Sequence, residues 1–302
     1  MNHYNNIDPT TVKGLARAIS LVEAGVGGTN SFLSNWVAKQ PKVAPIVGVT
    51  GPPGAGKSTL INALIHNWVA QGKRIAIIAI DPSSPFNFGA LLGDRIRMVE
   101  HFTNHQVFIR SLATRGALGG LSAKSIEISD LIRRAGFDIV LVETVGVGQS
   151  EVEIAGLADL SIVVLVPEAG DDIQGMKAGI MEIADLFIVN KADRPGAEQF
   201  ASRLRKLLHG GNGLNEDTQV LLTTATDSNS ITMVAAEVLN QLSVVSKNNE
   251  KQAQLYLMKC LKLLSEQRMQ SISKLDLYTE IKDRLLTKSS VNIYEMIAKY
   301  AL

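Results

Sequence analysis

A doubly wound, mainly parallel α/β sheet is the fold that this 302-residue sequence predicts, with helices before it and a helical arm after it. Short apolar runs alternate with segments of helical periodicity, which is the pattern of a parallel sheet covered by helices on both faces. A glycine-rich loop also separates the first apolar run from a helical segment. The expected strands cover residues 45–50, 75–80, 107–110, 138–142, 161–166, 185–190 and 219–223.

The expected organisation has three parts along the chain. They are an N-terminal helical extension over residues 1–42, a sheet domain over 43–245 and a C-terminal helical arm over 246–302. Within the extension, residues 11–24 carry apolar side chains at helical spacing, and Asp8 or Thr10 is available as the N-cap. The arm is also helical in pattern, and its residues leave two uses open: packing back on the sheet or forming a subunit interface.

Composition and charge limit the classes of function. Apolar residues make up 46% of the chain and charged residues 20%, and no apolar run approaches the roughly 20 residues of a membrane-spanning helix. Lysine and arginine number 30 against 29 acidic residues, so no net field favours nucleic acid or a membrane surface. The N-terminus lacks the pattern of a secretory signal and Cys260 is the one cysteine, so we expect a soluble, cytoplasmic protein.

A phosphate-binding loop is predicted between the first strand and the helix that follows it. Residues 51–59 fit the pattern G-x-x-x-x-G-K-[ST], in which glycines let successive backbone N–H groups face a phosphate and the helix N-terminus adds positive potential. Lys57 supplies a positive charge between phosphates, and Ser58 offers a hydroxyl to Mg²⁺. The predicted loop consists of Gly51, Pro52, Pro53, Gly54, Ala55, Gly56, Lys57, Ser58 and Thr59.

Two carboxylates at strand ends are expected to complete a magnesium site with Ser58. Asp81 follows the second apolar run and Glu143 the fourth, and ligands of open α/β sheets bind at the carboxyl ends of strands. Either carboxylate is also open to a role as a helix cap or a solvated strand end. Residues 143–146 have the D-x-x-G form of a γ-phosphate sensor with Glu in the first place. We therefore expect Glu143 to reach the ion through water and Gly146 to offer its backbone N–H.

The choice of base is predicted from a second loop. Residues 190–193 follow the sixth apolar run and match N-K-x-D. The Asp193 carboxylate accepts from the guanine N1–H and exocyclic amine, a pattern that adenine lacks, while Lys191 lays its stem along the base and Asn190 ties this loop to the phosphate loop. The residues expected to contact the guanine oxygen through the backbone are Thr224, Ala225 and Thr226. The predicted ligand is therefore GTP or GDP with Mg²⁺.

Charged residues in the loops between these elements are candidates for catalysis and switching. Asp94 is a candidate to orient water and Arg97 to neutralise charge in the transition state, and with Lys57 and Glu143 they form the expected catalytic set. An exposed charge with no role is an equally open interpretation for each loop residue. The other candidates, in loops expected to move with the nucleotide, are Arg115, Asp171, Gln174 and Lys177.

The ordered set of motifs resembles the G-protein chaperones of methylmalonyl-CoA mutase, the MeaB or ArgK family of SIMIBI-class P-loop GTPases. The resemblance covers roughly residues 10–245 and rests on GPPGAGKST, DPSSPFNFGALLGDRIRM, ETVGVGQSE, PEAGDDIQGMKAGI and NKAD. It implies a Mg²⁺-dependent GTPase, slow by itself, that binds an adenosylcobalamin-dependent acyl-CoA mutase, gates cofactor loading and protects the mutase.

The resemblance also assigns roles to particular residues. It implies that Asp81 and Glu143 belong to the Mg²⁺ and nucleotide site and that Asp94 and Arg97 lie in a first switch. The residues implied for a further switch that the mutase reads are Asp171, Gln174 and Lys177. The C-terminal helices are implied to form a homodimer.

Two other classes of protein fit parts of the pattern. A P-loop kinase or ATPase that acts on a small molecule has the same phosphate loop, but it usually selects ATP, whereas N-K-x-D favours GTP. A nickel-insertion chaperone on a similar domain calls for Cys and His ligands at metal spacing. His101 and His105 form an isolated i, i+4 pair, which we interpret as a feature of a helix surface.

Overall fold

The computed structural model divides the chain into two compact units, Met1–Tyr256 and Leu257–Leu302. The first unit contains the sheet and the helices that cover it. The described residues are 3–40, 42–81, 98–113, 123–144, 154–170, 178–209, 218–245, 247–270, 272–287, 293, 296 and 299. None of the helices in these ranges has an apolar stretch of the length that crossing a bilayer requires. The domain boundaries drawn after residues 42 and 245 stay predictions.

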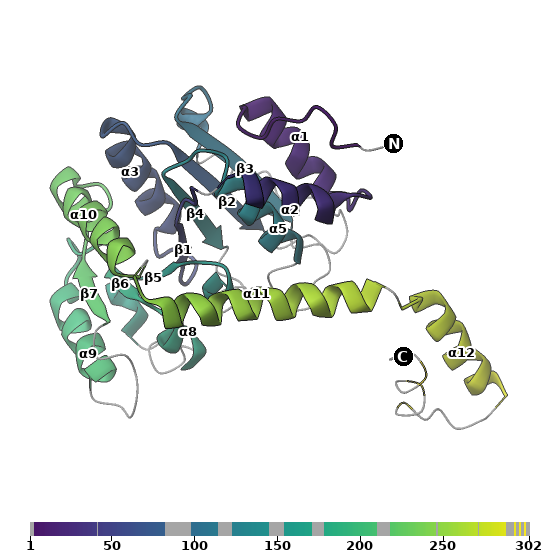
Figure 1. Ribbon diagram of the computed structural model, residues 1–302. Helices are drawn as coiled ribbons and strands as arrows, with labels where there is room; N and C mark the ends of the chain where they lie inside the picture. The colour runs from purple at the N-terminus through teal and green to yellow at the C-terminus, as the bar shows by residue number, and fades with distance from the viewer. Residues whose placement is uncertain are drawn as a thin grey trace. The chain divides into compact units, whose positions relative to one another are not determined.

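A seven-stranded parallel sheet forms the centre of the first unit (Figure 1). Its strands are β1 (Ile46–Thr50), β2 (Ile75–Asp81), β3 (Val107–Ala113), β4 (Ile139–Thr144), β5 (Leu160–Leu165), β6 (Leu186–Val189) and β7 (Gln219–Leu222). They lie in the order β3-β2-β4-β1-β5-β6-β7, and every neighbouring pair is parallel. The predicted fold class is confirmed. Strands β1, β4, β5 and β6 are buried along their whole length, which explains why they are mainly apolar.

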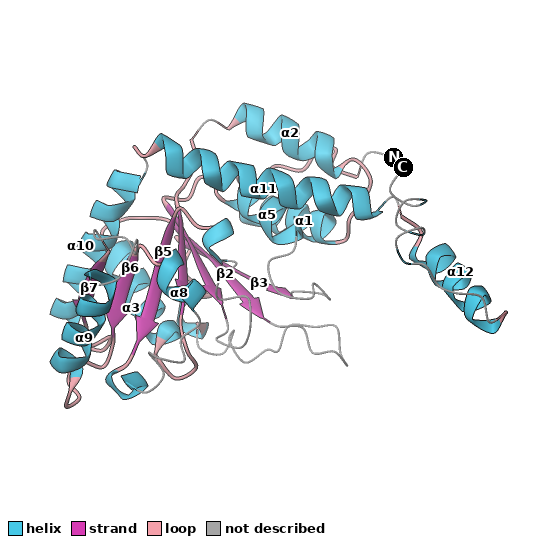
Figure 2. Ribbon diagram, turned by 90° about the horizontal axis from the view of Figure 1, so that it is seen from below, coloured by secondary structure: helices cyan, strands magenta, loops and turns pink. Residues whose placement is uncertain are grey.

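Helices cover both faces of the sheet (Figure 2). They are α3 (Lys57–Ala70), α5 (Ala123–Ile132), α8 (Ala178–Ile183), α9 (Ala197–His209) and α10 (Ser228–Val245), with short 3₁₀ turns η1 (Val99–His101), η2 (Ile154–Gly156) and η3 (Pro167–Gly170). Along β5, Ile162 and Val164 pack with α3 and α10, whereas Val163 and Leu165 pack with α9. This alternation fills both faces and leaves the carboxyl ends of the strands as the edge at which loops gather.

Two further helices precede the sheet. They are α1 (Val12–Glu23) and α2 (Thr29–Lys39), and both contact α5. An ion pair of 2.6 Å between Glu23 and Arg110 also joins α1 to the edge strand β3. The predicted amphipathic face is buried, except that Val12 at its start is exposed. The N-terminal helices are therefore part of the same compact unit as the sheet.

The predicted cap of the first helix is wrong. Thr11 occupies the N-cap, and its hydroxyl oxygen accepts from the backbone N–H of Gly14 at 3.0 Å. Asp8 instead accepts from the backbone N–H and the hydroxyl of Thr10, at 2.9 and 2.7 Å. Both arrangements satisfy polar groups near a helix start, so the neighbouring residues compete for the same role and the sequence alone does not rank them.

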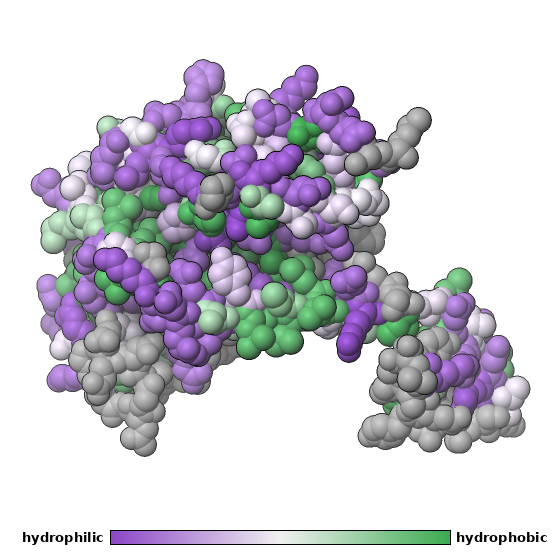
Figure 3. Space-filling model, in the orientation of Figure 1, coloured by the Kyte–Doolittle hydropathy of each residue, from purple (hydrophilic) through white to green (hydrophobic). Residues whose placement is uncertain are grey.

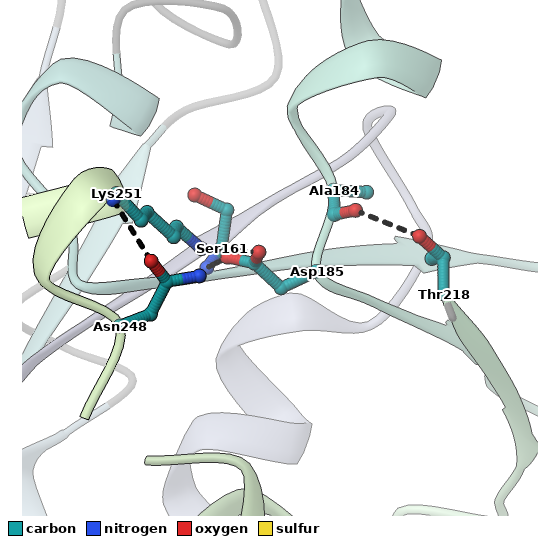
Figure 4. A network of polar contacts seen from close by, with 6 residues as sticks. All are labelled: Ser161, Ala184, Asp185, Thr218, Asn248 and Lys251. Atoms are coloured by element: carbon teal, nitrogen blue, oxygen red, sulfur yellow. Dashed lines mark hydrogen bonds and ion pairs between the residues drawn. The ribbon is translucent and has the colours of Figure 1, made fainter. Parts of the chain in front are cut away.

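At the amino-terminal ends of the strands, opposite the carboxyl ends, Asp185 joins the starts of two strands to a C-terminal helix (Figure 4). It accepts from the backbone N–H of Ser161 at 2.8 Å and forms an ion pair with Lys251. Lys251 lies in the first turn of α11 (Asn249–Gln270), where its backbone N–H donates to the Asn248 side chain at 3.0 Å. The start of α11 is thus fixed to β5 and β6.

A buried ion pair also stabilises the amino-terminal ends of the strands. Asp159 accepts from Arg133 Nη2 at 2.8 Å and from the backbone N–H of Ile46 at 2.7 Å, while Arg133 Nε donates to Ala44 O at 3.0 Å. Asp159→Ala leaves a buried guanidinium without its carboxylate, so we expect the free energy of unfolding to fall by about 3–5 kcal/mol. Urea unfolding measures this change.

The matched control for Asp159→Ala is Lys42→Ala. The pair between Lys42 and Asp138 is 3.5 Å long and the lysine side chain is 79% exposed, so its loss is expected to cost about 0–1 kcal/mol. A shift in urea midpoint for Asp159→Ala that is no larger than that of the control would contradict the prediction.

The second unit contains the end of α11 and helix α12 (Lys274–Leu286). Ser273 caps α12 by accepting from the backbone N–H of Asp276, and Glu280 forms ion pairs with Arg284 and Lys299. Figure 3 shows apolar side chains gathered along α11. The apolar side chains of this unit that are more than half exposed are Leu257, Met258, Leu261, Leu264, Met269, Leu275, Tyr278, Leu285, Leu286 and Ile293.

Candidate nucleotide-binding site

The predicted phosphate loop connects β1 to α3 at the carboxyl edge of the sheet. Two of its glycines have no room for a side chain. A Cβ on Gly51 would lie 2.2 Å from the Val164 carbonyl oxygen, and a Cβ on Gly56 would lie 2.4 Å from Asn190 Nδ2. Both glycines also have positive φ, of 139° and 85°. The loop backbone therefore packs against two neighbouring strand ends in a conformation that only glycine adopts without strain.

Lys57 is the first residue of α3, and its side chain is turned back toward the loop. Its ammonium group donates to the carbonyl oxygens of Gly51 at 2.8 Å and Pro52 at 3.1 Å. The residue is 8% exposed. A positive charge is thus held beside the loop and at the N-terminus of a helix, where both contribute positive potential for an anion.

Ser58 and Glu143 lie together, as a shared metal site requires. The Ser58 hydroxyl donates to Glu143 Oε1 at 2.7 Å, and the glutamate is buried at the carboxyl end of β4. A hydroxyl and a carboxylate are hard oxygen donors of the kind Mg²⁺ prefers, so this pair fits the ion. Asp81 ends β2, whose Ala79 is in register with Glu143 on the adjacent strand. The Asp81 side chain lies outside the described atoms.

Asn190 joins the phosphate loop to the base loops. It follows β6, is 2% exposed, and its amide donates to the Ala55 carbonyl at 2.9 Å. Its amide oxygen accepts from the backbone N–H of Ala225 at 3.1 Å. The predicted contact between the two loops is therefore present, and the same side chain also reaches the loop after β7.

Lys191 and Asp193 extend the base loop toward solvent. Lys191 has a positive φ of 57°, and its ammonium group donates to the Gly54 carbonyl at 2.8 Å. The stem of this lysine thus spans from the base loop to the phosphate loop. Asp193 is exposed, and its Oδ1 lies 3.4 Å from the hydroxyl of Thr224, which donates to it. How these two side chains lie against a bound base stays a prediction.

The loop after β7 is fixed from within the protein. The backbone N–H of Thr224 donates to Ser230 Oγ at 3.1 Å, and that of Ala225 donates to Asn190. Both backbone donors thus have acceptors within the protein, and the contact of Thr224, Ala225 and Thr226 to a guanine oxygen stays a prediction. Ser230 is a residue that the sequence analysis missed, since a lone serine in the first turn of a helix carries no pattern.

Several predicted residues lie outside the described part of the chain. They are Asp94, Arg97, Arg115, Gly146, Asp171, Gln174 and Lys177. Their roles in catalysis, phosphate sensing and switching stay predictions. The described residues of the site come from four loops and strand ends at one edge of the sheet, as the prediction from open α/β sheets requires.

The interpretation of His101 and His105 as a pair on a helix surface is wrong. His101 ends the 3₁₀ turn η1 and is 2% exposed, whereas His105 lies in the turn that follows. The neighbour of His101 is His66 of α3, whose ring centroid lies 4.6 Å away. Burial is the main cause that lowers the pKa of His101, and a hydrogen bond with His66 is the main cause that lowers the pKa of Glu100.

The fold and the loops at its carboxyl edge define a P-loop nucleotide-binding protein. A family model described as methylmalonyl Co-A mutase-associated GTPase MeaB matches residues 15–275. The chain belongs to this MeaB family.

Sequence similarity to individual relatives agrees with the assignment to this family. A Caulobacter vibrioides relative named as a GTPase is 38% identical over 247 residues, which cover 79% of this chain and 76% of that protein. A Pyrococcus horikoshii relative, also named as a GTPase, is 57% identical over 155 residues, which cover 51% of this chain and 49% of that protein. The chain thus spans about half the length of the Pyrococcus relative.

A solved structure supports the fold. The crystal structure of a LAO/AO transport system kinase superposes with a TM-score of 0.68 at 24% sequence identity, and the match covers 99% of this chain and 92% of that one. At this level of identity the likeness concerns the fold alone.

Proposed function

We propose that this protein binds GTP and GDP with Mg²⁺, hydrolyses GTP slowly by itself, and reports its nucleotide state to a partner enzyme. The observation that carries the proposal is the position of Asn190, whose amide contacts both the phosphate loop and the loop after β7. A single buried side chain therefore couples the site for phosphate to the site for the base. Membership of the MeaB family supports the same function.

In the proposed site, each described residue has a separate task. The loop backbone cradles the phosphates, and the Lys57 ammonium group exchanges its two carbonyl acceptors for phosphate oxygens. Ser58 and Glu143 would hold Mg²⁺, the serine directly and the glutamate through water. The chemistry that the bound ion supplies is neutralisation of charge on the phosphates. Lys191 covers the base and Asp193 selects guanine.

The proposed partner is an adenosylcobalamin-dependent acyl-CoA mutase, for which this protein gates cofactor loading and protects the enzyme. The support is the description of the family model, which names a methylmalonyl Co-A mutase-associated GTPase. Since phosphoryl transfer depends on positioning and charge neutralisation, a partner that completes the site would accelerate hydrolysis.

The experiment that tests the partner measures GTP turnover with and without a purified mutase of this class. We expect binding of the mutase and a rise in turnover of at least about tenfold, since completion of such a site by a partner has large effects. Glu198→Gln, on the exposed face of α9, serves as a surface control and is expected to respond as the native chain does. Absence of binding together with unchanged turnover would contradict the partner, but would leave GTP binding standing.

The alternative of a P-loop kinase or ATPase requires preference for ATP. Asp193 favours guanine because its carboxylate has no donor to offer to adenine N1. A calorimetric titration that showed tighter binding of ATP than of GTP would favour this alternative.

Homodimer formation is proposed through the exposed apolar side chains of the second unit. On α11, Leu257, Leu261 and Leu264 recur at spacing i, i+4, i+7 and are more than half exposed. Such a stripe is typical of a helix that packs against another chain.

The dimer is tested by light scattering after size exclusion. We expect a mass twice that of the 32.5 kDa chain, and a monomer for the double variant Leu261→Asp and Leu264→Asp, because the charges would have to be buried without partners. Met233→Asp alters an exposed apolar residue of α10 and is expected to stay dimeric. A native monomer at micromolar concentration would contradict the proposal.

A further inference from the structure

Three side chains with metal-ligating atoms meet at a point that the nucleotide site does not use. His66 lies on α3, while Glu100 and His101 belong to η1, which is far from α3 in sequence. In the part of the chain that the structure describes, one ligand atom from each of these residues lies within 4.8 Å of the other two. The contact joins the helix that follows the phosphate loop to the 3₁₀ turn that leads toward β3.

The separations are close to those of a coordinated ion. His66 Nε2 lies 3.3 Å from Glu100 Oε1, and His101 Nε2 lies 3.9 Å from the same oxygen. With metal–ligand bonds of about 2.0–2.2 Å, two ligands of a tetrahedral site lie about 3.4 Å apart. The first separation therefore already has the required length, and the second needs a movement of about half an ångström, which side-chain rotation provides. The third separation, between the two histidines, is at most 4.8 Å and shortens with the same rotation.

The surroundings hold one ligand in place and leave the others adjustable. His101 is 2% exposed, and its Nε2 donates to Asn62 Oδ1 at 2.7 Å. His66 and Glu100 are about half exposed, with side-chain values of 59% and 50%. A fixed buried imidazole with two accessible ligands gives an ion a path from solvent and leaves a coordination position for water.

An ion at this position replaces hydrogen bonds that already exist. Asn62 contacts both Glu100 and His101, so its amide now occupies the polar groups that an ion would engage. Binding through His101 Nε2 requires the proton of that nitrogen to be carried on Nδ1 of the same ring instead. The Glu100 carboxylate accepts hydrogen bonds without the ion and would be a ligand with it, and neither state requires a change in its protonation.

We propose that His66, Glu100 and His101 bind one borderline divalent transition-metal ion, of the Zn²⁺ or Co²⁺ class, and that the bound ion clamps η1 to α3. Two imidazoles and one carboxylate favour such ions over Mg²⁺ or Ca²⁺, which take mainly oxygen ligands. The site is separate from the proposed Mg²⁺ site, whose oxygen donors Ser58 and Glu143 lie at the start of the same helix and on β4.

The test is a titration of the full chain with Co²⁺, followed by competition with Zn²⁺, in the presence of saturating GDP and Mg²⁺ so that the nucleotide site is filled. We expect one Co²⁺ per chain, with the visible absorption bands of nitrogen ligation. His66→Ala and Glu100→Gln are expected to weaken binding at least about tenfold, since loss of even an outer-shell partner costs 10–100-fold. Both side chains are exposed enough that the fold should tolerate the change.

The matched control is His105→Ala, which removes an exposed histidine four residues from His101 but outside the cluster. It is expected to bind Co²⁺ as the native chain does. His66→Cys, which keeps a metal-ligating atom, is expected to retain binding better than His66→Ala. A native chain without saturable binding, or an equal loss in His105→Ala, would overturn the proposal and leave the cluster as a hydrogen-bonded contact between α3 and η1.

Discussion

Lys57→Ala is expected to lower the rate of GTP hydrolysis by about 10²–10³-fold, the usual effect of removing one preorganised charge-stabilising group. The ammonium group is already held beside the phosphate loop by Gly51 O and Pro52 O, so only the exchange of these two acceptors for phosphate oxygens is needed to present its charge. Charge on the transferring phosphoryl group develops in the transition state, and a fixed cation stabilises that state more than the ground state. Single-turnover hydrolysis at saturating GTP measures the effect on the chemical step.

Lys57→Ala also removes the hydrogen-bond donor of two carbonyl oxygens, which affects the stability of the fold. Without the ammonium group these buried or part-buried oxygens lose their donor, so we expect the free energy of unfolding to fall by about 1–3 kcal/mol. Circular dichroism against temperature checks that the fold is retained. Lys206→Ala removes an exposed lysine of α9 and is expected to hydrolyse GTP at the native rate. Hydrolysis by Lys57→Ala within threefold of that control would contradict the catalytic role.

The sheet could be predicted from the sequence because its strands are buried on both faces. A strand such as β5, with every residue buried, consists mainly of apolar residues, and Ser161 is its one polar residue. The phosphate loop could also be predicted from the sequence, since Gly51 and Gly56 occupy positions where the end of a neighbouring strand leaves no space for a Cβ. In both cases a local physical requirement leaves a local pattern.

Features that depend on contacts between distant segments could not be predicted in the same way. His101 is buried because η1 packs against α3, and nothing within a few residues of it specifies that partner. The spacing to His105 suggested a helix face that does not exist. The cap of α1 failed for a different reason, because Asp8, Thr10 and Thr11 offer similar oxygen acceptors within one turn. Sequence patterns identify the chemistry available, while packing selects among equivalent groups.

Asp193→Asn is expected to change which base the protein binds. The native carboxylate is an acceptor for both the N1–H and the exocyclic amine of guanine. In the variant the amide oxygen still accepts from N1–H, but the amide NH₂ meets the guanine amine, so two donors face each other. Since a hydrogen bond to a charged group contributes about 1.5–3 kcal/mol, GTP affinity should fall about 10- to 150-fold.

Xanthine nucleotides provide the complementary half of this prediction. Xanthine has a carbonyl oxygen where guanine has its amine, so the side-chain NH₂ group introduced by Asp193→Asn gains an acceptor that the native carboxylate would repel. The variant should therefore bind XTP more tightly than GTP, reversing the native order. Thr224, whose hydroxyl lies 3.4 Å from Asp193 Oδ1, can orient the amide oxygen as it does the carboxylate.

Calorimetric titration of both chains with GDP and XDP measures this reversal without interference from hydrolysis. Glu198→Gln removes one negative charge on α9 and is expected to keep the native order, which separates base recognition from the change in net charge. A loss of GDP affinity without a gain for XDP would mean that Asp193 acts by shaping its loop. Unchanged affinity for both nucleotides would mean that the guanine edge is recognised elsewhere, and would contradict the role proposed for Asp193.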